Sequence, residues 1–209
     1  MKMLLWFAAA VAAYVVSSWN PAITLSKAIY HKDIRTCGSG NPGFTNFKRT
    51  FGNKWAWWVM LLDMCKAGLV VLLFAWLFRF FGYDFQLGAA YTGIFALAGH
   101  AYPVWYEWKG GKGFLVTLSV IAVVDWRVGL AAFVLMTILL LTTDYMSLST
   151  VTALLLSPFM LIFMKAKPVA IVIVSVMVLF VAVRHKENFK RLIAGTEKHF
   201  LRKPKEEQQ

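Results

Sequence analysis

The segment from Asp33 to Asn46 combines glycines with hydroxyl and amide side chains, a composition that suits an anion-binding loop. Glycines let successive backbone N–H groups turn toward one point, as they do in nests and P-loops. Arg35 can add a fixed, bidentate partner for a phosphate. An ordinary turn between two helices is the alternative. The candidate phosphate-binding residues of this segment are Gly38, Ser39, Gly40, Asn41, Gly43, Thr45 and Asn46.

A second glycine-rich run carries two lysines and follows shortly after a histidine. Glycines at a helix start allow an anion to approach free N–H groups, and the helix dipole favours negative charge there. The run therefore predicts a second phosphate site, with a flexible connector as the alternative. The histidine alone is more often a packing residue than a proton carrier. The candidates are His100, Lys109, Gly110, Gly111, Lys112 and Gly113.

A third basic segment closes the apolar part of the chain. If the last apolar helix continues through it, Arg184, Asn188 and Arg191 share one face. His185 is a candidate general base, because the unperturbed pKa of histidine lies near neutrality. Glu197 is a candidate ion-pair partner for one of the arginines, which would hold the chain end against the bundle. A basic helix end at the membrane interface is the alternative for the whole segment.

Two charged residues, Asp63 and Lys66, lie three positions apart inside a long apolar stretch. Charges at that depth are expensive and are usually paired or functional. We expect a structural ion pair that faces the bundle interior. Cys37 and Cys65 are expected to be free thiols. A secreted disulfide scaffold is excluded, because two cysteines in 209 residues cannot form a framework.

Composition identifies the class of protein. Of the 209 residues, 59% are hydrophobic and 15% are charged, whereas soluble domains have about 45–50% apolar and about a quarter charged residues. The mean hydropathy is +0.62. Nine Trp and 17 Phe exclude disorder. The net charge is +12. Nucleic-acid binding needs a basic, soluble surface, and this apolar chain has little of one, so we expect no nucleic-acid partner. We assign the surplus Lys and Arg residues to cytoplasmic loops.

The expected fold is all-α, a polytopic membrane helix bundle with about seven transmembrane helices. Five or six spans are the alternative, because the fourth and fifth are short and almost contiguous. Of the 22 Lys and Arg residues, sixteen fall on one side, which predicts an outside N-terminus and a cytoplasmic C-terminus. Residues 1–209 form one domain, with a solvated tail from about 199. The expected spans are 3–19, 55–78, 87–106, 110–124, 128–143, 146–164 and 169–183.

Together the three segments resemble the bacterial acyl-phosphate:glycerol-3-phosphate acyltransferases, the PlsY family. The resemblance runs from about residue 17 to residue 198. Its motifs are Asp33-Ile-Arg-x-x-Gly-Ser-Gly-Asn-x-Gly-x-Thr-Asn46, Gly99-His-x-x-Pro103 with Lys109-Gly-Gly-Lys-Gly113, and Arg184-His-x-x-Asn188-x-x-Arg-Leu-x-x-Gly-x-Glu197.

The resemblance implies transfer of an acyl group from acyl phosphate to the sn-1 hydroxyl of glycerol 3-phosphate. The products are lysophosphatidate and phosphate, in phospholipid biosynthesis at the cytoplasmic face of the cell membrane. No metal or cofactor is implied, and a phosphate acyltransferase is the expected supplier of acyl phosphate. Either His185 or a substrate phosphate takes the hydroxyl proton, and the family favours the phosphate.

The resemblance also implies roles for individual residues. The catalytic candidates are Ser18, Arg35, His185 and Asn188. Arg184 and Arg191 are further phosphate-binding candidates, in addition to the residues of the two glycine-rich segments. Asp63, Lys66 and Glu197 are expected to support the structure.

Some positions depart from the family pattern. Ser18-Trp-Asn20 precedes Pro21 where the family usually has Ser-Ile-Pro, Phe44 replaces a usual alanine, and Phe114-Leu115 replace a smaller pair. We expect these side chains to alter the pocket or the preferred acyl chain. A transporter for a phosphorylated solute and a lipid-binding protein without chemistry are the rival functions, although the Gly-rich breaks are expected at the membrane rim rather than at the midplane that transporters use.

Overall fold

The computed structural model describes residues 2–202, and these residues form helices and connecting loops without a β-strand. Two 3-10 turns, η1 (Ile34–Thr36) and η2 (Val104–Tyr106), lie in the loops. The helices are α1 (Lys2–Ser18), α2 (Pro21–Tyr30), α3 (Phe44–Phe51), α4 (Asn53–Phe80), α5 (Phe85–Ala101), α6 (Phe114–Val124), α7 (Trp126–Thr143), α8 (Met146–Phe163), α9 (Pro168–Arg184) and α10 (Lys186–Ile193).

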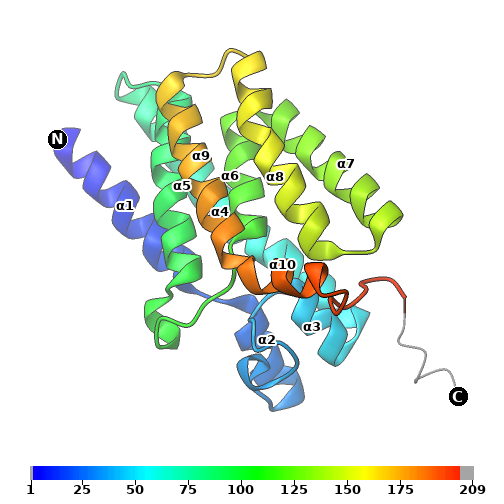
Figure 1. Ribbon diagram of the computed structural model, residues 1–209. Coiled ribbons are helices and arrows are strands. Elements are labelled where there is room, and N and C mark those ends of the chain that lie inside the picture. The colour runs from blue at the N-terminus through cyan, green and yellow to red at the C-terminus, as the bar shows by residue number, and fades with distance from the viewer. Residues whose placement is uncertain (1, 203–209) are drawn as a thin grey trace, which may run out of the picture.

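The apolar helices α1 and α4 to α9 form a bundle, and the short helices α2, α3 and α10 gather at one of its ends (Figure 1). Many large apolar side chains on the outside of the bundle are exposed, among them Leu69, Leu141 and Phe159. A soluble protein rarely exposes so much contiguous apolar surface. This surface is the one that a bilayer would cover.

Each of the seven predicted spans falls on one of these apolar helices. Four segments of the described chain are long and apolar enough to cross a membrane, namely Lys2–Tyr30, α4, α7 and α8. A fifth is added if α9 and α10 count as one bent span, and α6 has only 11 residues. The all-helical membrane architecture is confirmed. The number of crossings and the orientation of the termini stay predictions.

The last apolar helix does not continue straight through the third segment. Helices α9 and α10 meet at an angle of 53°. The Nδ1 of His185 lies 2.8 Å from the carbonyl oxygen of Val181, and its backbone N–H donates to Ala182 instead. A side chain that takes the i−4 carbonyl disturbs the helical ladder and bends a helix. Arg184, Asn188 and Arg191 therefore do not share one continuous helical face.

Small residues let the helices approach closely. Gly93 of α5 lies against Val120 of α6, and a Cβ at Gly99 would overlap the backbone carbonyl of Tyr14 in α1. Membrane helices associate mainly through such packing, because lipid tails are as apolar as the side chains. The close approach of α1 to α5 fixes the end of α5, from which the second candidate segment starts.

We expect Gly99→Ala to lower the melting temperature of the detergent-purified protein, because its methyl group would overlap the Tyr14 backbone and overpacking costs about 1–3 kcal/mol. Gly68→Ala is the matched control. Its Cβ would meet Ser119 at an ordinary 3.7 Å, and alanine is the better helix former by about 1 kcal/mol. Equal melting temperatures for the two variants would contradict the close α1–α5 contact.

Candidate functional site

The three candidate segments meet in one pocket at the end of the bundle where α3 and α10 lie. One wall comes from the glycine-rich loop and α3, a second from the start of α6, and a third from α10 and the start of α8. The polar and charged side chains of the lining are Ser39, Asn41, Thr45, Asn46, Arg49, Asp63, His100, Lys112, Ser147, Thr150, His185, Asn188, Arg191 and Glu197.

Two helices begin on the wall of this pocket without a side-chain cap. Helix α3 starts after Gly43 and α6 starts after Gly113, and neither N-cap residue makes a side-chain hydrogen bond. An uncapped start leaves backbone N–H groups unpaired and carries the positive end of the helix dipole. Gly113 has φ +92° and faces Leu97, a conformation that glycine adopts without strain. Both helix starts therefore favour an anion in the pocket.

The glycine-rich loop is not an open cradle of N–H groups. The side chain of Asn46 accepts a hydrogen bond from the N–H of Ser39 at 3.0 Å and donates to the carbonyl of Cys37 at 3.0 Å. The N–H of Gly40 donates to Cys37, and that of Gly43 donates to Asn41. Asn46 therefore holds the loop in shape, and the start of α3 supplies the donors on this wall.

Among the described residues, Arg49, Lys112 and Arg191 bring positive charge to the lining. Asn188 joins them to a carboxylate, since its Oδ1 accepts from Lys112 and its Nδ2 donates to Glu197 at 2.7 Å. Arg191 Nε donates to the other oxygen of Glu197 at 2.7 Å. The expected pairing of Glu197 with an arginine is confirmed, and Glu197 holds α10 in place at the pocket.

Burial changes the protonation of two groups in this lining. Burial and the charge of Arg191 lower the pKa of Lys112 to about 8. Burial and the charge of Lys112 lower the pKa of His185 to about 4, so its imidazole is neutral at pH 7. Since Nδ1 of His185 lies at a carbonyl, which can only accept, Nδ1 carries the proton and Nε2 keeps its lone pair.

The expected ion pair between Asp63 and Lys66 is confirmed, with Nζ and Oδ1 2.9 Å apart and both side chains buried. His100 joins the pair, because its Nδ1 lies 3.2 Å from Lys66 Nζ and 3.5 Å from Asp63 Oδ1. Lys66 also donates to the carbonyl of Trp19. The cluster ties α4 to α5 and to the end of α1. The backbone of Gly111 then packs on His100.

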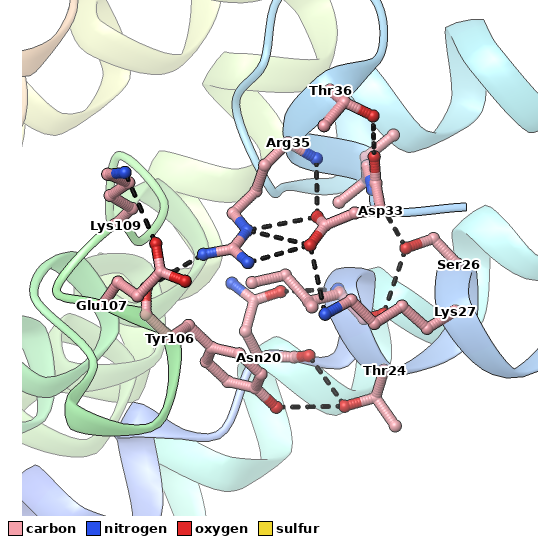
Figure 2. A network of polar contacts seen from close by, with 12 residues as sticks. Asn20, Thr24, Ser26, Lys27, Asp33, Arg35, Thr36, Tyr106, Glu107 and Lys109 are labelled. Atoms are coloured by element: carbon pink, nitrogen blue, oxygen red, sulfur yellow. Dashed lines mark hydrogen bonds and ion pairs between the residues drawn. The ribbon is translucent and has the colours of Figure 1, made fainter. Parts of the chain in front are cut away.

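Arg35 lies outside the lining of the pocket, contrary to its predicted place in a phosphate clamp. Its Nη2 pairs with the carboxylate of Asp33 at 2.8 Å, and its Nη1 donates to the carbonyl of Tyr106 at 3.0 Å (Figure 2). The guanidinium of Arg35 in turn holds the pKa of Asp33 well below its usual range. Because Asp33 lies only two residues away, it engages the guanidinium locally. Arg35 therefore ties the glycine-rich loop to the loop after α5.

Other predicted residues also lie away from the lining. Ser18 is fully buried and donates to the carbonyl of Tyr14. Lys109 pairs with Glu107 in solvent. Arg184 donates to the carbonyl of Gly110 at 3.3 Å and lies over the ring of Tyr102. Gly38, Gly40, Gly110 and Gly111 shape the two loops behind the pocket.

The pocket also contains residues that the motifs did not single out as site residues. Arg49 lies one helical turn after Thr45 on α3, so the i, i+4 spacing could have identified it. Ser147 and Thr150 come from the start of α8. No charge or glycine pattern marks these two, and only the packing of α8 against the third segment brings them here. Phe44, Phe114 and Leu115, the bulky departures, line the apolar part of the pocket.

The family model described as glycerol-3-phosphate acyltransferase matches residues 7–195. The chain belongs to this family. It is 34% identical to the glycerol-3-phosphate acyltransferase of Ralstonia pickettii, covering 94% of both chains. It is 36% identical to the one from Aquifex aeolicus, over 80% of this chain and 85% of the relative.

The solved structure of PlsY (YgiH) in its glycerol 3-phosphate form has the same fold. The TM-score is 0.86 at 29% identity, covering 93% of this chain and 95% of that one. The lysophosphatidic acid form matches with a TM-score of 0.82. The chain is thus a multi-pass membrane acyltransferase of the glycerol-3-phosphate acyltransferase family, which acylates glycerol 3-phosphate in phospholipid synthesis.

The lowered pKa of Lys112 predicts how binding of glycerol 3-phosphate depends on pH. Lys112 is charged below its pKa of about 8 and neutral above it, so affinity falls as the pH rises through that value. We expect the dissociation constant to rise severalfold between pH about 7 and about 9. In Lys112→Arg the rise should disappear, because a guanidinium stays charged. The same rise in both proteins would show that another group causes it.

Proposed function

We propose that this protein transfers an acyl group from acyl phosphate to the sn-1 hydroxyl of glycerol 3-phosphate, giving lysophosphatidate and inorganic phosphate. One observation carries the proposal. Two uncapped helix starts and the side chains of Arg49, Lys112 and Arg191 line a single pocket. Both reactants carry a phosphate, and two phosphates need this many fixed donors and cations at close quarters.

Two similar solved structures support glycerol 3-phosphate as the acyl acceptor. PlsY (YgiH) has been solved in a glycerol 3-phosphate form and in a lysophosphatidic acid form, and these two molecules are the acceptor and the product of the proposed reaction. The apolar part of the lining supports a lipid-like donor. Phe114, Leu115, Phe133 and Met136 border the pocket on the side of α6 and α7, so the acyl tail reaches the pocket from the bilayer.

In the proposed step, the sn-1 hydroxyl oxygen attacks the carbonyl carbon of acyl phosphate. A new ester C–O bond forms, and the bond between the carbonyl carbon and the phosphate oxygen breaks. The phosphate leaves with the electron pair of that bond. Lys112 and Arg49 neutralise charge on the phosphates, and the helix starts orient them. Acyl phosphate is already an activated donor, so positioning and electrostatic stabilisation supply the main part of the catalysis.

The hydroxyl proton passes to a phosphate oxygen of the substrate in this proposal. His185 offers an unprotonated Nε2 at the pocket, but burial lowers its pKa to about 4, which makes it a weak base. Phosphate dianions are stronger bases than that. His185 then orients the hydroxyl and Asn188 orients Lys112, and Glu197 supports Asn188 from behind.

We also propose that the pocket faces the cytoplasm, with the N-terminus outside. The basic loops support this orientation, because Lys and Arg accumulate in cytoplasmic segments. Glycerol 3-phosphate then arrives from the cytosol, and a phosphate acyltransferase supplies the acyl phosphate. Residues 1–209 act as one catalytic domain of the cell membrane.

The donor is tested with purified protein in detergent, glycerol 3-phosphate, and either acyl phosphate or acyl-CoA of the same chain length. We expect lysophosphatidate and an equal amount of inorganic phosphate from acyl phosphate, and no product from acyl-CoA. Omitting glycerol 3-phosphate should abolish phosphate release. If lysophosphatidate forms from acyl-CoA and not from acyl phosphate, the assignment of the donor is wrong, whereas glycerol 3-phosphate remains the acceptor.

The proton acceptor is tested with His185→Gln, which keeps a donor near Val181 but removes the imidazole base. If a substrate phosphate takes the proton, kcat should fall much less than about a hundredfold, the scale of general-base catalysis. His31→Gln, an exposed histidine outside the pocket lining, is the control. A loss of kcat of a hundredfold or more in His185→Gln, with an unchanged KM for glycerol 3-phosphate, would identify His185 as the base.

A further inference from the structure

After α10 the described chain runs back across the end of the bundle instead of leaving it. Residues 198–202 form a segment that we call the C-terminal strap. The family model ends at residue 195, so the strap lies beyond the part of the chain that it covers. The sequence predicted a solvated tail from about residue 199, but Phe200 is 9% exposed and packs in a hydrophobic cluster with α3. Residues 203–209 lie outside the described residues.

A buried carboxylate in the turn between α7 and α8 binds the strap. Asp144 Oδ1 accepts from the N–H groups of Phe200 at 3.0 Å and Leu201 at 2.6 Å, and Oδ2 accepts from Arg202 at 3.3 Å. The N–H of Phe200 also lies 3.0 Å from the Asp144 carbonyl. The ring of His199 stacks on Tyr145 with centroids 4.9 Å apart. Successive backbone donors that converge on one charged acceptor hold the strap in a single place.

The strap in turn contacts α3, whose start lines the pocket. The ring of Phe200 lies 5.8 Å from that of Phe44, the first residue of α3, and Lys48 Nζ lies 3.6 Å from the Phe200 centroid. Aromatic rings at this spacing attract each other beyond the effect of their buried area. Phe44 is also one of the residues that departs from the family motif, and the strap explains what the larger side chain packs against.

The strap also holds a cation of the pocket. Arg49 Nη2 donates to the carbonyl of Lys198 at 2.8 Å and lies 3.4 Å from that of His199. Arg49 lines the pocket together with Thr45. A long arginine side chain has much rotamer freedom, and a fixed acceptor reduces what must be ordered when an anion binds.

We propose that the C-terminal strap is a positioning element of the phosphate site, which fixes Arg49 for an incoming phosphate. The inference rests on the proposed function, in that the pocket binds phosphate. Asp144 and Phe200 act through Arg49 and do not touch substrate. A merely structural strap would stabilise the fold without any specific link to Arg49.

The test measures equilibrium binding of glycerol 3-phosphate to purified protein in detergent, with inorganic phosphate as a competing probe. Phe200→Ala and Asp144→Asn should each weaken binding about five- to tenfold. Leu201→Ala, an exposed neighbour in the strap, and Asp84→Asn, which caps α5 at the other end, should change it less than twofold. Melting temperatures show whether each variant is folded. If Phe200→Ala does not fold, Asp144→Asn provides the test of the strap. Unchanged binding in a folded strap variant overturns the proposal.

The decisive arm repeats the strap variants in an Arg49→Lys background, where the side chain no longer reaches both strap carbonyls. If the strap acts through Arg49, Phe200→Ala and Asp144→Asn should weaken binding less than twofold further. The same five- to tenfold loss in both backgrounds would assign the strap a general structural role.

The binding readout separates this proposal from the reaction. A wild-type protein that binds glycerol 3-phosphate but makes no lysophosphatidate from acyl phosphate overturns the proposed donor, and the strap measurement still stands. A wild-type protein that binds neither glycerol 3-phosphate nor phosphate overturns the pocket assignment and the strap together.

Discussion

The rest of the structure depends on fixed positive charge held at the edge of a low-dielectric helix bundle. Arg49, Lys112 and Arg191 line one pocket together with the uncapped starts of α3 and α6. Burying such charge is costly unless it is paired. Within the described chain, the carboxylate of Glu197 supplies a part of that pairing through Asn188 and Arg191. The positive charge that Glu197 leaves unpaired produces a positive potential in the pocket, and this potential favours the binding of an anionic reactant.

The surrounding elements follow from the need to hold these charges in one place. The cluster of Asp63, Lys66 and His100 fixes the end of α5 and the loop packed on it. Arg35 ties the glycine-rich loop to the loop after α5. The bend at His185 turns α10 across the end of the bundle, so that Asn188 meets Lys112. Polar ties of this kind are rigid because each buried donor or acceptor that loses its partner carries a desolvation cost.

Much of this arrangement could be predicted from local patterns. The lengths of the apolar segments predict the helices, and the cost of burying a charge predicts the pairing of Asp63 with Lys66. The glycine-rich and basic segments also meet in one pocket, as their composition suggests. The errors come from side-chain partners that spacing does not reveal. The sequence predicts Arg35 in a phosphate clamp, yet the neighbouring Asp33 pairs with its guanidinium. Asn46 serves its own loop rather than the pocket alone. The contacts of Asp144 and Phe200 span more than 50 residues of sequence, and no periodicity encodes a contact at that distance.

The central claim is that phosphate binds between the start of α3 and Lys112. An experimental structure of the protein with glycerol 3-phosphate tests it most directly. We expect phosphate oxygens at hydrogen-bonding distance, about 2.7–3.2 Å, from Lys112 Nζ, from Arg49 or Arg191, and from a backbone N–H at the start of α3 or α6. A phosphate bound at Arg35 or elsewhere outside this pocket, with the pocket unoccupied, would contradict the account.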